Sequence, residues 1–469
     1  MFRLRSIHLL RAALLLIGLT LVAAACSSDS DDEDAAEAQA DADSSDNADD
    51  DADADSSDNA DDDADADSDD DADDRPAAGT TPLFVPSDTD EPFDLSGGAT
   101  LATEGVTIVA DSPTAALQPQ VLSATEVWPT DWTRQTIDLG DLGLGIPRAD
   151  PRDMIPPIDI PKFEPIAEAD WLTEREPGAL VQFEDEVRFY PLSILTRHEI
   201  VNDRFGNIPV IVTFCPLCNT AISFDARVDG KFARFGVSGL LRNSDLVMWD
   251  SETVSLWQQL TGEAIVGEFA GTKLDLISTA IVSYGDALES FPDALSLSQD
   301  TGFGSNYGAN PYVGYSDSKS PFLFSGDPDP RFPALSRVVG LTVEDDAKAY
   351  PFGLLEEVGA VNDVVGDLPI VVWWGGETAD ALQGETVANG GTIGTGIAFD
   401  RRVDDQELTF SAEGDAQFTD AETSSTWNLL GQAIEGPLAG EQLTLVPHRN
   451  EFWFAWAAFF PEALVYEAG

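Results

Sequence analysis

The chain has 469 residues, of which 86 are acidic and 24 are basic, and its formal net charge at pH 7 is −62. A charge of this sign and size argues against nucleic acid and against anionic lipid surfaces as partners. The length that follows the acidic N-terminal region suits two domains of ordinary size.

The first 26 residues have the pattern of a bacterial lipoprotein signal. Three arginines and an apolar run precede the small residues Ala23, Ala24 and Ala25, and Cys26 follows directly. The apolar run is shorter than a membrane span and ends in small residues, as secretory signals do. We therefore expect a lipid on Cys26 that anchors the protein at the extracytoplasmic face of the cell membrane. An ordinary signal peptide with an incidental cysteine is the alternative.

Residues 27–100 are predicted to be a disordered tether. The part from 27 to 74 consists almost entirely of Asp, Ala and Ser, with 25 acidic residues and no basic one. Such a segment cannot bury apolar surface, and its charges repel one another, so it should be extended.

A unit that occurs twice makes up most of the remaining chain. Residues 201–203 (Val-Asn-Asp) recur at 361–363, and the string Phe-Pro-Asp-Ala-Leu at 291–295 recurs as Phe-Pro-Glu-Ala-Leu at 460–464. Each copy is rich in β-branched and alternating segments. The prediction is an α+β fold with two homologous β-rich lobes, an N-terminal lobe at 131–335 and a C-terminal lobe at 336–469.

Local patterns place the main elements of the first copy. The alternating segment 179–190 predicts a pair of strands, and the apolar run 208–214 predicts a buried strand. The dipeptide Asp229-Gly230 lies between two alternating runs and predicts a hairpin. Helices are expected at 191–202 and 283–291, and the aromatic stretch 452–460 is expected to be a buried helix in the second copy.

The first copy contains the only two cysteines besides Cys26, in the motif Cys215-Pro216-Leu217-Cys218. Two cysteines at this spacing in an exported protein can form a metal site, a redox couple or a structural disulfide. A strand is predicted before the pair and a hairpin after it, which disfavours the thioredoxin arrangement at a helix N-terminus. A strand-to-strand knuckle can aim both sulfurs at one ion. The second copy has Gly375 and Thr378 at these positions.

Two further soft ligands occur in the first copy only. His198 is replaced by Val358 in the second copy, and Met248 by Phe418. Together with the two thiols, they form a donor set that favours copper, with zinc as the second choice. Each residue also has a structural explanation, because single His and Met residues are common in protein cores.

Polar residues beside these candidates are predicted to support the site. Glu199, replaced by Gly359 in the second copy, is a candidate carboxylate behind a ligand. The predicted loop 236–245 supplies Arg242, Asn243 and Asp245 as candidate ligand-binding residues. Arg242 is expected to bind a carboxylate or phosphate, or else to form a surface salt bridge with Asp245.

Several strings in the chain resemble a known family. They are 198–203 (His-Glu-Ile-Val-Asn-Asp), the run from Pro209 to Cys218, the run from Gly239 to Met248, and 255–257 (Ser-Leu-Trp). They resemble the bacterial and archaeal family called domain of unknown function 3179, from about Asp131 to the C-terminus. The resemblance implies little chemistry, because no activity is established for that family.

Three functions are consistent with these patterns. The first is an anchored extracytoplasmic lipoprotein that binds a soft metal at Cys215, Cys218 and His198, with Met248 as a possible fourth ligand, for metal handling or electron transfer. The second is an exported thiol-disulfide oxidoreductase that uses the cysteine pair. The third is a non-catalytic lipoprotein that binds a ligand or a protein and has a structural disulfide. Whether the protein is an enzyme stays open at this stage.

Overall fold

The computed structural model describes residues 92–467, apart from residues 405 and 415. The predicted signal sequence, Cys26 and the predicted tether up to residue 91 lie outside the described residues. Folded contacts begin before residue 100, because the amide of Asp94 donates to the carbonyl of Asn207 at 2.9 Å and the amide of Ala99 donates to the carbonyl of Arg227 at 3.0 Å.

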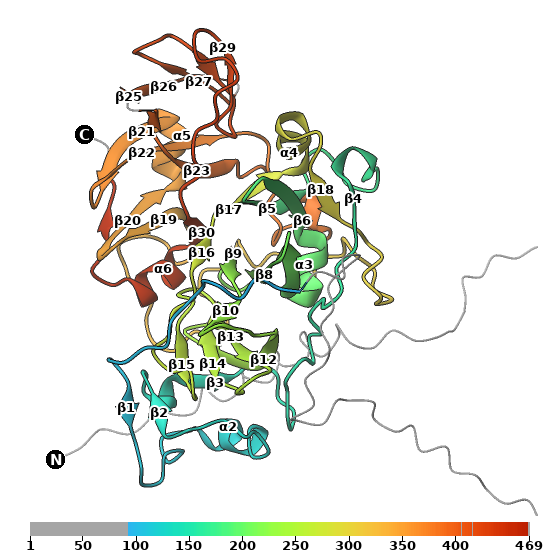
Figure 1. Ribbon diagram of the computed structural model, residues 1–469, viewed down its shortest axis with the longest axis vertical. Coiled ribbons are helices and arrows are strands. Elements are labelled where there is room, and N and C mark those ends of the chain that lie inside the picture. The colour runs from blue at the N-terminus through green and yellow to red at the C-terminus, as the bar shows by residue number, and fades with distance from the viewer. Residues whose placement is uncertain (1–91, 405, 415, 468–469) are drawn as a thin grey trace, which may run out of the picture. The chain divides into compact units, whose positions relative to one another are not determined.

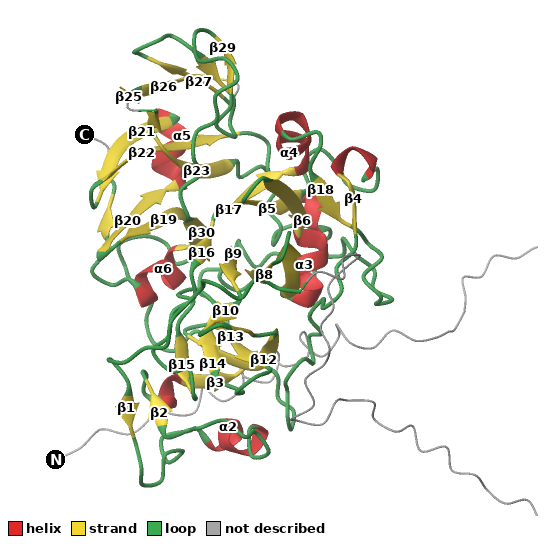
Figure 2. Ribbon diagram, in the orientation of Figure 1, coloured by secondary structure: helices red, strands yellow, loops and turns green. Residues whose placement is uncertain are grey.

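Strands dominate the described residues, and the α-helices are short, with six or seven residues each (Figures 1 and 2). Over the described range, no helix is both long and apolar enough to cross a bilayer. The fold is therefore β-rich with a few helices at the ends of strands.

Residues 177–297 form the first copy of the repeated unit. Its elements are β5 (Pro177–Phe183), β6 (Glu186–Pro191), α3 (Leu192–His198), β7 (Ile200–Phe205), β8 (Ile208–Cys215), β9 (Thr220–Asp225), β10 (Arg227–Val228), β11 (Lys231–Phe232), β12 (Phe235–Arg242), β13 (Asp245–Asp250), β14 (Leu256–Gln258), β15 (Ala264–Val266), β16 (Leu276–Ile277), β17 (Thr279–Ser283), α4 (Tyr284–Ser290) and β18 (Leu295–Leu297).

Residues 337–465 form the second copy, with the same order of elements except that a single bridge between Phe399 and Leu445 takes the place of β16. They are β19 (Arg337–Val343), β20 (Asp346–Pro351), α5 (Phe352–Val358), β21 (Ala360–Val365), β22 (Leu368–Gly375), β23 (Thr395–Asp400), β24 (Arg402–Val403), β25 (Gln406–Glu407), β26 (Phe410–Gly414), β27 (Gln417–Asp420), β28 (Thr426–Trp427), β29 (Ala433–Glu435), β30 (His448–Phe452), α6 (Trp453–Phe459) and β31 (Leu464–Val465). A short 3-10 helix at Val387–Asn389 lies between β22 and β23.

The two copies also share strand pairings. Strand β17 is antiparallel to β5 and β18 is parallel to β6, as β30 is to β19 and β31 is to β20. Trp257 donates its indole N–H to Asp250 at 2.8 Å, and Trp427 donates to Asp420 at 3.0 Å. The helices predicted at 283–291 and 452–460 are present as α4 and α6, and the hairpin predicted at Asp229-Gly230 joins β10 to β11.

Short elements before the first copy extend two of its sheets. They are β1 (Thr107–Ile108), α2 (Pro119–Ala124), β2 (Arg134–Gln135), the 3-10 helix Leu139–Asp141, β3 (Leu142–Leu144), β4 (Phe163–Pro165) and the 3-10 helix Ile166–Glu168. Three of them join a seven-stranded sheet of the order β1-β2-β15-β14-β13-β12-β3, and β4 pairs with β18 in a five-stranded sheet. Strands of two or three residues are too short for a period to be recognised in the sequence.

The two copies share their hydrophobic cores. One buried cluster contains both Cys215 and Phe452, and another contains both Phe189 and Trp373. The aromatic stretch 452–456 is buried as predicted, with each residue at most 1 % exposed. Because strand β30 of the second copy contacts β9 of the first, elements of the second copy lie next to the cysteine motif.

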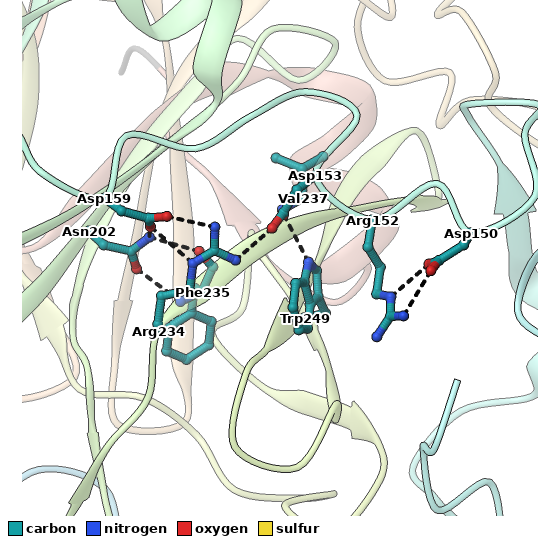
Figure 3. A network of polar contacts seen from close by, with 9 residues as sticks. All are labelled: Asp150, Arg152, Asp153, Asp159, Asn202, Arg234, Phe235, Val237 and Trp249. Carbon is teal, nitrogen blue, oxygen red and sulfur yellow. Dashed lines mark hydrogen bonds and ion pairs between the residues drawn. The ribbon is translucent and has the colours of Figure 1, made fainter. Parts of the chain in front are cut away.

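A polar network fixes the β12–β13 hairpin to the segment that precedes the first copy (Figure 3). Arg234 pairs with Asp153 at 2.7 Å and with Asp159 at 2.9 Å. Asn202 donates to Asp159 and to the carbonyl of Phe235, and accepts from the amide of Phe235. Asn202 thus has a structural role, since it joins β7 to the first residue of β12.

Candidate metal centre

The cysteine motif forms a tight turn between two strands. Strand β8 ends at Cys215, strand β9 begins at Thr220, and these two residues are paired. Asn219, with a φ of 54°, donates its amide to the carbonyl of Pro216 at 3.2 Å and closes the turn. The motif is therefore the strand-to-strand knuckle that the sequence predicts, and a strand follows it.

A second hairpin brings a carboxylate to this knuckle. Asn243 and Ser244 both have positive φ angles, 52° and 66°, as a type I′ turn requires. This turn joins β12 to β13, so the prediction of a loop over 236–245 is wrong. The Ser244 carbonyl lies 3.6 Å from the Cys218 sulfur and 3.9 Å from the Cys215 sulfur, within reach of both thiols. Asp245 follows as the first residue of β13.

Cys215, Cys218 and Asp245 form a group that could hold a metal ion. One ligand atom from each residue lies within 4.8 Å of the others, and all three residues are buried. Both cysteines are free thiols. The two sulfurs and one carboxylate oxygen therefore converge on one point, although they come from two separate hairpins.

When no cation is present, the surroundings of the group favour the protonated forms of its two thiols and its carboxyl. Burial raises the pKa of both thiols, and Asp245 adds to this effect. Burial also raises the pKa of Asp245 to about 6, although its Oδ2 accepts from Gln258 at 2.6 Å and from the amide of Leu260 at 3.0 Å. Its Oδ1 has no hydrogen-bond partner other than the neighbouring thiols within the described part of the chain. A bound cation would favour the ionised forms of all three groups.

His198 is not part of this group. Its Nδ1 lies 2.6 Å from the carbonyl oxygen of Pro156, and its Nε2 lies 2.7 Å from the hydroxyl of Tyr307. Burial lowers the pKa of His198. Both ring nitrogens therefore already have partners, and a ligand role for His198 stays a prediction that this geometry does not support.

The contacts of Met248 and Arg242 differ from those predicted from the sequence. Met248 is fully buried in the hydrophobic core, paired with Val237 and Trp257. It lies three residues after Asp245 on one strand, so the two side chains leave opposite faces of the sheet. Arg242 has its ion-pair contact with Asp141, at 3.8 Å, and not with Asp245. Asn243 is the first residue of the hairpin turn and has a structural role there.

Two buried glutamates lie near the group. Glu199 ends helix α3 with a φ of 57°, where the second copy has Gly359 with a φ of 71°. Glu451 belongs to β30 of the second copy. Burial raises the pKa of each to about 8, and the charge of Asp245 contributes to both shifts. Glu199 was a candidate from the sequence. Glu451 was not among the residues predicted from the sequence. The first copy has the apolar Val282 at the equivalent position, and this difference was detectable.

The segment between the copies covers the knuckle. The hydroxyl of Tyr315 donates to the carbonyl of Leu217 at 2.9 Å, and the carbonyl of Phe322 accepts from the hydroxyl of Ser244 at 2.5 Å. Tyr312 is partly buried in this region, where desolvation raises its pKa, with a further contribution from Glu199. The segment between the copies therefore packs over the cysteine motif.

The fold and the site together define a β-rich protein with a repeated unit and one buried thiol–carboxylate group. Residues 152–463 match the model of the family described as "Protein of unknown function (DUF3179)", and the chain belongs to this family. No curated protein matches the chain. No solved structure matches it either.

Proposed function

We propose that the protein binds one transition-metal ion at Cys215, Cys218 and Asp245 and serves in metal handling. The observation that carries this proposal is the convergence of three buried ligand atoms within 4.8 Å of one another. A buried carboxyl without a cation is unfavourable, because it must keep its proton or leave a charge unpaired. The recurrence of elements supports an internal duplication in which only one copy has the site.

Zinc is the metal that fits this donor set best. The sequence favours copper because His198 and Met248 add two soft ligands to the thiols. The group in the structure instead has two sulfurs and one carboxylate oxygen, which zinc accepts and which leave one coordination position open. Copper(I) remains the second candidate because of the thiolate pair. A zinc site has no redox function, so metal handling is preferred to electron transfer.

The thiol-disulfide oxidoreductase is less consistent with the surroundings of the cysteines. Exchange requires an accessible thiolate, but Cys215 and Cys218 are 2 % and 0 % exposed. Burial also raises the pKa of both thiols, which lowers the fraction of thiolate at neutral pH. These features favour a metal site over a redox couple.

The location at a membrane rests on the sequence. We propose that a lipid on Cys26 holds the protein on the extracytoplasmic face of the cell membrane, because an apolar run and three alanines precede this cysteine. Growth with labelled palmitate tests this. The label should be present on the protein and absent from a Cys26→Ser variant. Equal labelling of the two would contradict the proposal.

Metal analysis tests the proposed site directly. The protein, purified from a metal-replete culture, should retain about one zinc per chain after dialysis, and a Cys215→Ser/Cys218→Ser variant should retain none. A Thr378→Ala variant changes the position that corresponds to Cys218 in the second copy and is the matched control. The proposal fails if the unaltered protein takes up neither Zn(II) nor Cu(I) on titration.

A further inference from the structure

Strand β30 of the second copy is tied directly to the proposed site. The amide of Phe452 donates to the carbonyl of Cys218 at 2.9 Å. The Arg449 Nε donates to the carbonyl of Leu260 at 2.9 Å, and the amide of the same Leu260 donates to Asp245 Oδ2. Strand β30 therefore binds the backbone of Cys218 directly, and it also binds Leu260, whose amide donates to Asp245.

The side chains of β30 differ in kind from those of its counterpart. Strand β17 pairs with β5 in the register in which β30 pairs with β19, so Arg449 corresponds to Ala280 and Glu451 to Val282. All four residues are buried. The copy that lacks the cysteines thus contributes two charged residues next to them, where the equivalent strand has small apolar ones.

The connection between β22 and β23, which corresponds to the cysteine knuckle in the second copy, shows the same contrast. There, Thr378 shares a hydrogen bond with Thr395 at 2.7 Å, and Thr395 donates to the carbonyl of Ile281 in β17 at 3.3 Å. Strand β17 brings Ala280 and Val282 to that region, and no charged pair. Within the described residues, the buried pair of Arg449 and Glu451 lies next to the thiols, and the equivalent place in the second copy has no such pair.

Glu451 has unsatisfied hydrogen-bonding capacity in this region. Its side chain is 0 % exposed, and neither carboxylate oxygen has a hydrogen-bond partner among the described residues. Arg449 Nη2 and Trp456 Nε1 are buried without partners as well. A β-carbon added to Gly340 would lie 2.4 Å from the Trp456 ring and 3.1 Å from Glu451 Oε1. The Trp456 ring and the Glu451 carboxylate are therefore neighbours. Buried polar groups without partners are uncommon and unfavourable, so a polar ligand is expected here.

We propose that Glu451 completes the metal centre by accepting a hydrogen bond from a water molecule in the fourth coordination position of the ion. This inference rests on the proposed function, because it assumes the ion at Cys215, Cys218 and Asp245. Three protein ligands leave one position for water in a tetrahedral zinc site. Glu451 is outside the group whose ligand atoms lie within 4.8 Å of one another, so it reaches the ion through a water and not directly.

The charges of the proposed arrangement largely offset one another. Two thiolates and one carboxylate on a dication leave a net charge of −1, and the charges of Glu451 and Arg449 offset each other. Hydrogen bonds from groups behind a metal ligand orient that ligand and strengthen binding, and their loss typically weakens metal affinity by about 10- to 100-fold. Glu451 is accordingly a positioning residue that acts through the bound water.

Co(II) titration of the full chain tests the role of Glu451. Co(II) replaces zinc in such sites and reports its coordination through visible absorption bands. We expect Glu451→Gln to weaken Co(II) affinity by about 10- to 100-fold and to shift the bands. The matched control is Glu176→Gln, because Glu176 is also a buried glutamate with an unpartnered oxygen but is not near the thiols in any described contact. Its affinity and bands should equal those of the unaltered protein.

A second variant covers the case in which Glu451→Gln does not fold. Arg449→Ala/Glu451→Val installs the pair that β17 has at the equivalent positions, where it is accommodated in a buried core. It should show the same weakening. Unchanged affinity and bands in a folded variant would overturn the role of Glu451 while the metal site stands. Failure of the unaltered protein to bind Co(II) or Zn(II) would instead refute the proposed site itself, and the inference with it.

Discussion

Substitution of Cys218 tests its assignment as a metal ligand. Cys218 is fully buried, and its sulfur can reach the other two donors of the group. A Cys218→Ser variant removes one of three protein ligands, so Zn(II) affinity should fall more than about 100-fold, beyond the loss typical of a residue behind a ligand. Competition with a chromogenic chelator measures this. Thr378→Ser in the second copy is the control, and equal affinities in both variants would contradict the assignment.

A substitution of His198 distinguishes the metal site predicted from the sequence, which includes His198, from the group in the structure, which does not. Because both of its ring nitrogens have partners, a His198→Gln variant should keep about one zinc per chain. Its free energy of unfolding should fall by about 1–3 kcal/mol, since the partners lose buried hydrogen bonds. Metal analysis and chemical denaturation give the two results. Loss of the metal in a folded variant would restore His198 as a ligand and with it the preference for copper.

The sequence identified the thiols but not the complete group around them. Cys215 and Cys218 were recognisable because their spacing is short and their second-copy counterparts differ. Asp245 was a candidate, but its place against the thiols depends on how a hairpin folds back over the knuckle. Glu451 was missed because it is more than 200 residues away in the chain and reaches the site only through the contact of β30 with β9.

At the level of elements, Asn202 connects two hairpins of the first copy. It bonds to both backbone groups of Phe235, and Asn362 does the same with Phe410 in the second copy. Asn202→Ala leaves these buried groups unpaired and should lower the free energy of unfolding by about 2–3 kcal/mol. It should also weaken Zn(II) binding, because the β12–β13 hairpin carries Asp245. Asn362→Ala is the control that should leave the affinity unchanged; equal effects on affinity would contradict this coupling.

Long regular strands were predictable, and irregular ones were not. The strand at Ile208–Cys215 has an apolar run that indicates its structure directly. Most of the hairpin strand at Phe235–Arg242 falls within 236–245, which the sequence predicts to be a loop, and Gly236 and Gly239 interrupt its pattern. Gly239 has a φ of 75°, and the pairing shifts between Val237 and Leu240, as in a β-bulge. A bulge moves later side chains to the other face, so the alternation on which sequence prediction relies is lost.

The stability of the whole molecule should depend on pH through its buried glutamates. The pKa values of Glu199 and Glu451 are raised by burial to about 8 from an ordinary value of 4.5. Between these values, the folded state binds more protons than the unfolded state, so metal-free stability should fall as pH rises from 5 to 8. The slope is at most roughly 1.4 kcal/mol per pH unit for each group.

Thermal unfolding from pH 5 to pH 8.5, with and without Zn(II), measures this dependence. The Glu199→Gln/Glu451→Gln variant is the control, and its metal-free profile should be flatter. Zn(II) should raise the melting temperature more at high pH, because binding displaces thiol protons and becomes stronger as pH rises. Metal-free stability that increases over this range would show that these carboxyls are not held protonated by the fold.

The two copies should not be separable, because each depends on the other for its core. A fragment that ends at Arg337 lacks β30, and with it the amide of Phe452 that holds Cys218. It also lacks Phe452 and Phe454, which are buried in the core cluster that contains both cysteines. Losing buried aromatic side chains costs roughly 3–5 kcal/mol each, so the fragment should aggregate and retain no zinc.

Deleting residues 27–74, which are predicted to be a tether, should leave both solubility and zinc content unchanged. Solubility and metal analysis of the two deletions decide the matter: a soluble fragment 92–337 with one zinc would show that the site belongs to the first copy alone.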